Sequence, residues 1–184
     1  MRRALVLLVL LATACATPGS SSPSGPPTLD TMSGFQSKLS STLDLKAAAA
    51  ATPAQPAATS SALSQAGFSA GTERIFTRGD EFIEIVAFGF STDVDAGQFV
   101  AFERSGLTSS KAAVLYADPA IPGSFVYDLS GGTRAGNRTV FCQGVWFAAH
   151  TSAYEVTDCA GSPRYPDLVE SVALRQYQSA SGGS

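Results

Sequence analysis

Apolar and polar residues alternate most clearly in two stretches near the middle of the chain, residues 73–77 and 82–90. The second stretch is apolar on both of its faces, with Ile83, Ile85 and Ala87 on one, and Phe82, Glu84, Val86, Phe88 and Phe90 on the other. A strand of this kind belongs in the middle of a sheet that is covered on both sides. The Gly79-Asp80 pair between the two stretches favours a tight turn, so we expect a β-hairpin.

A helix is expected directly after this hairpin. Thr92 and Asp95 have the spacing of a capping box, in which side chains satisfy free backbone N–H groups at the start of a helix. One side of the helix, which should end at Gly106, carries the residues with helical spacing: Ala96, Phe99, Val100 and Glu103. We expect this side to pack on the sheet.

Four more strands are predicted in the second half of the chain, at 113–116, 125–129, 139–142 and 145–151. The last two would form a hairpin through a turn at Gln143-Gly144. This turn would place Cys142 opposite Val145, with His150 on the other face beside Trp146.

A closing helix is predicted to start at Pro166 and to bury one stripe of residues: Leu168, Val169, Val172 and Ala173. The Ser- and Gly-rich tail, residues 179–184, should be disordered. The order β-β-α-β-β-β-β-α predicts an α+β fold, an antiparallel sheet of about five to six strands with helices packed on it. We expect this globular domain to span residues 67–178.

The chain between the signal sequence and this domain, residues 15–66, is predicted to be a tether of low complexity. Ser, Pro and Gly dominate 17–27, and 47–61 is rich in Ala and interrupted by Pro. Between these two segments, apolar residues recur at spacings of 3, 3, 4 and 4: Leu29, Met32, Phe35, Leu39 and Leu43. This spacing predicts an amphipathic helix within residues 28–46.

The first fourteen residues have the layout of a secretory signal peptide, with two arginines before a short apolar run at 4–12. That run is about half the roughly 20 residues that a membrane-spanning helix needs. Leu11–Cys15 resembles a bacterial lipobox, in which cleavage exposes a Cys that carries lipid, including palmitate. Ala12 stands where the lipobox most often has Leu, so ordinary cleavage after Ala14, with a free Cys15 thiol, is the alternative.

The charge balance excludes one large class of function. The 184 residues include 12 basic and 15 acidic ones, a net charge of -3, and cleavage before Cys15 would leave 10 basic residues and a charge of -5. Lys and Arg are scattered singly, without the basic face that phosphate neutralisation requires. We therefore expect no nucleic-acid partner, and a soluble body held to a membrane only by its lipidated end.

Assigning Cys15 to lipid leaves Cys142 and Cys159 as the remaining cysteines. An oxidising compartment favours a disulfide between them, and two free buried thiols are the alternative. Three Cys and a single His leave little room for a metal site with several such ligands, so we expect neither metal nor cofactor.

A lipobox, a Ser/Pro/Ala tether and a strand-helix-strand domain that closes with a Cys-linked hairpin and a helix together resemble the small envelope lipoproteins of high-GC Gram-positive bacteria. Several of these proteins carry PsbP-like or related sensor-type domains. The resemblance covers the layout of most of the chain. It implies a binding or sensing role outside the cytoplasm and brings no catalytic residue with it.

Two features of the domain could carry chemistry. Gly67–Gly71 matches GxSxG around Ser69, and His150 follows it as in α/β-hydrolases. A nucleophile elbow has a strand before the Ser and a helix after it, whereas here a low-complexity segment precedes Ser69 and a strand follows. Glu84 could be a buried functional carboxylate, or it could pair with Arg74 on the neighbouring strand.

The sequence thus favours a non-enzymatic, lipid-anchored domain of the bacterial envelope that binds an unknown envelope protein or an apolar small molecule. The many Phe residues could line an apolar cleft for such a molecule, or they could fill the core. A secreted serine hydrolase that uses Ser69 and His150 is the alternative from a different class.

Overall fold

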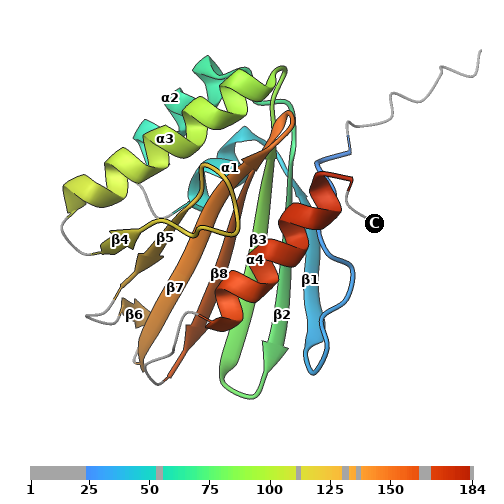
Figure 1. Ribbon diagram of the computed structural model, residues 1–184, viewed down its shortest axis with the longest axis vertical. Coiled ribbons are helices and arrows are strands. Elements are labelled where there is room, and N and C mark those ends of the chain that lie inside the picture. The colour runs from blue at the N-terminus through green and yellow to red at the C-terminus, as the bar shows by residue number, and fades with distance from the viewer. Residues whose placement is uncertain are drawn as a thin grey trace, which may run out of the picture.

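The computed structural model describes residues 24–52, 56–110, 113–129, 133–135, 138–161 and 167–182, which form one antiparallel sheet with helices on both faces (Figure 1). Along the sheet the strands follow in the order β1 (Gln36–Leu43), β2 (Gly71–Arg78), β3 (Glu81–Gly89), β8 (Ser152–Ala160), β7 (Arg138–Ala149), β5 (Phe125–Asp128) and β4 (Val114–Tyr116). A short β6 (Thr133–Ala135) pairs with β7 beside this path. The helices are α1 (Leu45–Ala50), α2 (Pro56–Gln65), α3 (Asp93–Ser110) and α4 (Asp167–Ala180). The α+β class and the antiparallel sheet are confirmed, with more strands than the five to six expected.

The amphipathic helix α4 covers one face of the sheet, and it is drawn in red in Figure 1. Its buried residues Val169, Val172 and Ala173 have the predicted helical spacing and pack on apolar side chains from the central strands. Those side chains are Ile83, Ile85, Ala87, Val145, Phe147, Tyr154 and Val156. We call this side of the sheet the α4 face.

The helices α1, α2 and α3 lie on the opposite face, where a second core forms under them. Its strand residues are Leu43, Val86, Phe88, Phe125, Tyr127, Trp146 and Ala153. Aromatic rings dominate this core, because Phe88 stacks on Trp146 and Phe99 of α3 meets the edge of the same indole. We call this side the α3 face. As its alternation predicts, β3 is a central strand with a core on each of its faces.

Two local predictions match the structure closely. The strands β2 and β3 form a hairpin whose turn is Gly79-Asp80, with Gly79 at a φ of 63°. At the start of α3 the hydroxyl of Thr92 accepts a hydrogen bond from the backbone N–H of Asp95 at 3.1 Å. The helix continues past the expected end at Gly106 to Ser110, because Leu107 extends its buried stripe.

The hairpin expected at Gln143-Gly144 is wrong. Both residues lie in the middle of β7, a single strand, and the turn comes later, at His150 and Thr151. Cys142 therefore faces Cys159 of β8, in place of Val145. His150 is exposed in this turn with a φ of 51°, a left-handed conformation in which a His cannot line a strand face.

The helix expected within residues 28–46 is also wrong, because residues 36–43 form the edge strand β1, which pairs with β2. The apolar spacing has a different origin. Met32 and the half-buried Leu29 and Phe35 pack into the core of the α4 face, whereas Leu43 packs into that of the α3 face. Tertiary packing of two separate segments thus produced a spacing that resembles one helix.

The folded part of the chain also begins well before residue 67. The Ala-rich α1 and the helix α2 pack on the α3 face, with Ala48 and Leu63 fully buried. Small side chains let these short helices approach the sheet closely, so low complexity here does not mean a loose tether. At the other end, α4 includes Ser179 and Ala180, which were expected to be disordered.

Residues 24–35 lie against the folded domain as an N-terminal strap. The side chain of Gln176 in α4 holds it, since its carbonyl accepts from Leu29 N–H at 2.9 Å and its amide donates to Pro27 O at 3.2 Å. The predicted signal peptide, Cys15 and the first helical residue Pro166 lie outside the described residues. In the described part of the chain, no helix combines the length and the apolar character needed to cross a membrane.

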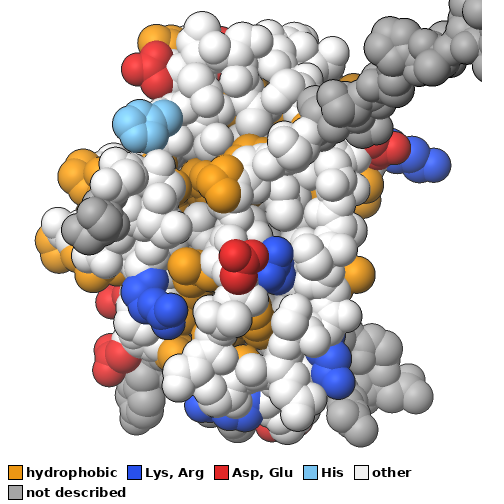
Figure 2. Space-filling view, turned by 90° about the vertical axis from the view of Figure 1, so that its right-hand side faces the viewer, with side chains coloured by type: hydrophobic (Ala, Val, Ile, Leu, Met, Phe, Trp, Pro, Cys, Tyr) orange, Lys and Arg blue, Asp and Glu red, His pale blue; other side chains and the backbone are white. Residues whose placement is uncertain are grey.

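The strand β1 forms one edge of the sheet and is nearly all exposed. Figure 2 shows this edge, where small groups of charged side chains, some of them acidic and basic side by side, lie among uncharged ones. The register of β1 shifts between Ser37 and Leu39. Such an irregularity, beside the exposed Lys38, discourages a further strand from adding to the edge.

Candidate binding site on the half-covered sheet face

The α3 face is covered at one end only. Val86 and Phe88 lie under the helices and are almost fully buried. Further along the same strand faces, Leu39, Ile75 and Phe82 belong to neither core and stay partly exposed, Leu39 to 39%. The polar residues described next lie where the covered end meets this open end.

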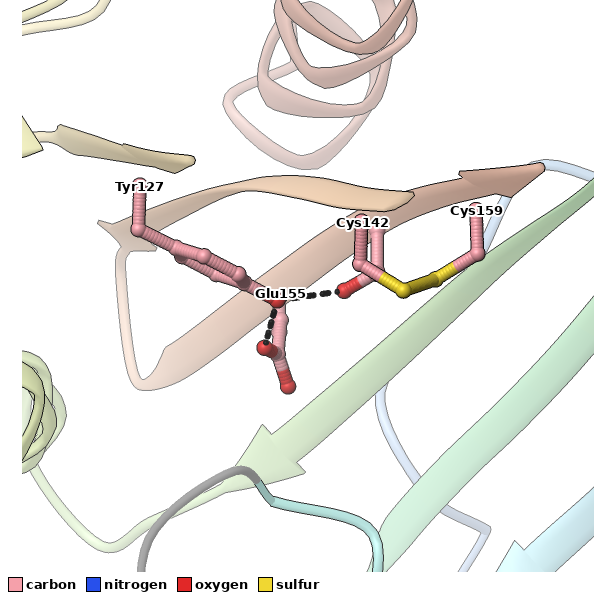
Figure 3. The surroundings of a disulfide bond; sticks show 5 residues. Tyr127, Cys142, Glu155 and Cys159 are labelled. Carbon is pink, nitrogen blue, oxygen red and sulfur yellow. Dashed lines mark hydrogen bonds between the residues drawn. A yellow bond between two sulfur atoms is a disulfide. The ribbon is translucent and has the colours of Figure 1, made fainter. Parts of the chain in front are cut away.

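A buried tyrosine and a buried glutamate form the centre of the site. The hydroxyl of Tyr127 in β5 donates to Glu155 Oε1 in β8 at 2.7 Å and lies 2.9 Å from Thr157 Oγ1 (Figure 3). Tyr127 is 2% and Glu155 3% exposed. Figure 3 shows both side chains on the side of the sheet away from α4. Burial and the neighbouring carboxylates Glu84 and Glu103 raise the pKa of Glu155 well above its usual value.

Gly144 makes the reach of Tyr127 possible. In the sheet register Tyr127 lies opposite Gly144 of β7, and Thr157 lies on the other side of the same glycine. The Tyr127 ring crosses β7 so closely that a Cβ at position 144 would overlap ring atoms Cε1 and Cζ. A glycine is therefore required here for close approach, which explains why Gln143-Gly144 is not a turn.

A third carboxyl group approaches from the covering helix. Glu103 lies on the buried side of α3, as its spacing predicts, and is 0% exposed. Neither of its carboxylate oxygens has a hydrogen-bond partner of ordinary geometry. Burial raises its pKa to about 7, although the nearby Thr59 hydroxyl lowers it in part.

Glu84 of β3 completes the group at its more exposed side. Its pKa is raised to about 8, mainly by burial. Glu73 on β2 adds to this shift through a shared hydrogen bond and through its negative charge. Glu73 also accepts a hydrogen bond from Ser41 Oγ of β1 at 3.1 Å. The charge of Glu84 raises the pKa of both Tyr127 and Glu155, so the three side chains act on one another.

We call Glu84, Glu103, Glu155, Tyr127 and Thr157 the carboxyl cluster. The ion pairs found among the described residues, Arg74–Asp30 and Arg78–Glu81, do not involve it. Within the same residues, no three His, Cys, Asp or Glu side chains are arranged to hold a metal ion. Several acids without a compensating cation are costly to bury, and such arrangements concentrate at functional sites.

The disulfide expected between Cys142 and Cys159 is present, with an Sγ–Sγ distance of 2.07 Å. It joins β7 to β8 on the α3 face, two register positions beyond the Gly144–Thr157 pair (Figure 3). The two strands that carry Gly144, Glu155 and Thr157 are thus tied together covalently beside the carboxyl cluster. A cross-link at this place holds the open end of the face in register.

The candidate catalytic pair of the alternative hypothesis is not assembled. Ser69 lies between α2 and β2, so a helix precedes it and a strand follows, the reverse of a nucleophile elbow. Ser69 and His150 are both exposed, and among the described residues no hydrogen bond joins them. The geometry gives no support to a hydrolase that uses these two residues.

Glu84, which the sequence suggested as a functional carboxylate, does belong to the site. Arg74, its suggested partner, does not. Arg74 pairs in register with Ile85, which places it on the α4 side, where it binds Asp30 at 3.1 Å. The two-residue turn at Gly79-Asp80 already implies this register, because it sets Arg78 opposite Glu81 and hence Glu84 opposite Ile75.

Sequence reasoning missed Tyr127 and Glu155, the centre of the site. Within β8, residues 154–157 alternate between apolar and polar, and this short signal places Glu155 on one face with Thr157. The contact of Tyr127 with both residues crosses three strands and leaves no local signal in the sequence.

Comparisons with known proteins give a likeness at the level of the fold. No protein-family model and no curated protein sequence matches the chain. A solved structure with a similar fold is the extracellular domain of PknH from Mycobacterium tuberculosis, with a TM-score of 0.55 and 13% sequence identity over 80% of this chain and 86% of that one. At this identity the likeness concerns the fold alone, which therefore also occurs in an extracellular domain of a mycobacterial protein.

Proposed function

We propose that this protein is an extracytoplasmic binding domain, held to the membrane by lipid on Cys15, that recognises its ligand on the open end of the α3 face. The carboxyl cluster is the observation that carries the proposal. These buried acids have no cationic partner within the described part of the chain, which costs folding free energy, and a ligand that compensates them gives a reason for their presence. The proposal includes no catalytic step.

Two further features support a location outside the cytoplasm. The Cys142–Cys159 disulfide is typical of proteins that fold in an oxidising compartment. The likeness to an extracellular domain adds a precedent for this fold in such a place. Both fit the signal peptide and the lipobox resemblance of residues 11–15.

The strap sets how far the domain would stand from the membrane. Residue 24, the first described residue, lies nine residues after Cys15. Nine fully extended residues span roughly 30 Å. A lipid on Cys15 would therefore keep the domain within about one domain diameter of the bilayer, close to ligands and partners at the membrane surface.

The anchoring part of the proposal is tested by fractionation of cells that express the full chain. We expect the wild-type protein in the membrane fraction with a lipid mass on Cys15, and the Cys15→Ser variant in the soluble extracytoplasmic fraction. Ser22→Ala, in the same segment, is the matched control and should fractionate like the wild type. A wild-type protein without lipid would contradict anchoring at Cys15.

The binding part is tested by native mass spectrometry of the Cys15→Ser chain, purified without detergent from its compartment. A noncovalent additional mass that is absent from the Glu155→Gln variant would support a small-molecule ligand on the carboxyl cluster. A stable complex with an envelope protein, lost in the same variant, would place a protein partner on that face. If Glu155→Gln changed neither, the proposed site would be wrong.

A further inference from the structure

We propose that the carboxyl cluster binds an organic cation, an amine or guanidinium group carried on an apolar body, and that binding releases protons. This inference rests on the proposed function, because it names the chemistry of the ligand for the same face. It follows from three properties of the site: unmet acceptors, the spread of the acids, and the apolar surface beside them.

The cluster has more hydrogen-bond acceptors, its carboxylate oxygens, than there are hydrogen-bond donors around them. Tyr127 supplies one hydroxyl, which already serves Glu155 and Thr157. The carboxylate of the fully buried Glu103 lies near the Thr59 hydroxyl, but neither of its oxygens makes a hydrogen bond of ordinary geometry, and this side chain comes from α3, opposite the strands that carry the other acids. Its charge acts on Glu155 and raises the pKa of that group. A ligand with several N–H donors would satisfy these oxygens.

Among the residues that the structure describes, the charged groups around the cluster are almost all acidic. Glu73 lies on β2, Glu84 on β3, Glu155 on β8 and Glu103 on α3. The exposed Arg104, next to Glu103 on α3, lies with its guanidinium carbon 6.0 Å from the centre of the Phe125 ring and makes no ion pair among the described residues. The local field therefore favours a cation.

The spread of the acids favours an organic cation over a metal ion. Strands in a sheet lie about 4.8 Å apart, and the acids come from β2, β3, β8 and a helix above them. No three of the described side chains are arranged around one metal position. An amine or guanidinium with an extended body can instead reach acids on different elements through separate hydrogen bonds.

The surface beside the acids is apolar. Leu39, Ile75 and Phe82 are partly exposed on the same face, and the open end where they lie adjoins Glu84. A ligand body packed there would bury apolar area on both sides of the contact. The ligand would thus place its charged group among the acids and its apolar part over these side chains.

Proton release follows from the state of the empty site. The raised pKa values of Glu84, about 8, and Glu103, about 7, mean that both groups carry protons for much of the time near neutral pH. A cation favours the ionised carboxylates, so its binding expels protons. Affinity should then rise with pH until the acids are ionised without ligand, by up to roughly tenfold per pH unit for each proton released.

The test is a calorimetric titration of the full chain from residue 15, carrying Cys15→Ser, with 1,6-diaminohexane at pH 6 and pH 8. The matched ligand is 1,6-hexanediol, which has the same apolar body and no charge. We expect binding of the diamine, at least tenfold tighter at pH 8, and little binding of the diol. Buffers of different ionisation enthalpy would report the protons released. Trp146, the single Trp, lies in register with Glu155 and gives an independent fluorescence signal.

Variants separate the site from the overall charge. Glu155→Gln and Glu103→Gln should each weaken diamine binding at least tenfold, while Asp167→Asn, which makes the same charge change on the exposed start of α4, should not. Equal binding of the diol and the diamine, both weakened by Glu155→Gln, would overturn the cation inference and leave the proposed site standing. Preferential binding of Ca²⁺ would overturn it too. Diamine binding that no cluster variant changes would overturn both.

Discussion

The two faces of the sheet differ in how well their buried polar side chains are hydrogen-bonded. On the α4 face the buried amide of Gln176 has two partners, Leu29 N–H and Pro27 O, both from the strap. On the α3 face Glu103 is just as buried, and neither of its oxygens makes a hydrogen bond of ordinary geometry, although the Thr59 hydroxyl lies nearby. A satisfied buried polar group contributes to specifying the fold, whereas an unsatisfied one costs free energy. Under the proposed function, Gln176 on the α4 face contributes to stability, whereas Glu103 on the α3 face carries a cost that a bound ligand would offset.

The largest test of this division is Phe147→Ala on the α4 face. Phe147 is fully buried and stacks on Tyr154 with ring centres 5.1 Å apart. Removing it should lower the free energy of unfolding by about 3–5 kcal/mol, measured by urea denaturation. Glu155→Gln on the other face should stay within about 1 kcal/mol of the wild type, because the amide keeps the shape and removes a buried acid. Equal losses in the two variants would contradict the division between the faces.

The disulfide gives the next largest effect, on the α3 face. Its loop closes over 17 positions, so the double variant Cys142→Ala, Cys159→Ala should lose about 3 kcal/mol of stability through the entropy of the unfolded chain. Reduction of the wild-type protein should give a similar loss, and a reductant should not change the double variant. If the loss were near zero, the β7–β8 pairing would hold the open end without help from the cross-link.

The elements that the sequence predicted well are those with strong local signals. Gly79-Asp80 defines the β2–β3 hairpin, and Thr92 with Asp95 starts α3 at the right residue. The predicted helix at 28–46 failed because its spacing combined residues that pack on opposite faces. Such a pattern looks the same in the sequence whether one helix or two separate segments produce it.

The site was predictable in part. Glu84 stood out as a lone carboxylate in an apolar strand pattern, and Glu103 was placed only on the sheet-facing side of its helix; the structure brings both to the cluster. Glu155 was missed together with β8, because the turn was placed at Gln143-Gly144. The true reason for Gly144 is the room that it leaves for Tyr127, a contact between strands that no local pattern encodes.

That contact provides a smaller test. Gly144→Ala would push the Tyr127 ring from its place over β7, so we expect a loss of about 1–3 kcal/mol from overpacking, together with weaker diamine binding. The matched control is Gly97→Ala within α3, where an added Cβ meets no atom within 4 Å. That change should stabilise the protein by about 0.5–1 kcal/mol, since Ala favours a helix over Gly. A neutral Gly144→Ala variant would show that Tyr127 does not depend on this glycine.

The smallest effect expected is a dependence of stability on pH that belongs to the α3 face. Glu103 and Glu84 have pKa values of about 7 and 8 in the folded protein, against 4.5 for an ordinary glutamate. The unfolded chain therefore releases these protons first. Their contribution to stability is fully present below pH 4.5 and is lost progressively as the pH rises through the folded values.

Glu103→Gln removes one of these groups, so the free energy of unfolding of the variant should rise relative to that of the wild type between pH 5 and pH 8. A difference on the order of 1 kcal/mol, or about 2–4 °C in Tm, is enough to detect by thermal denaturation across that range. Asp167→Asn makes the same change of charge on α4 and should leave the wild-type slope unaltered. Diamine should also reduce the slope in the wild type, because a bound cation stabilises the ionised acids that otherwise oppose folding at high pH. Parallel curves for wild type and Glu103→Gln would contradict a raised pKa for Glu103 in the folded protein.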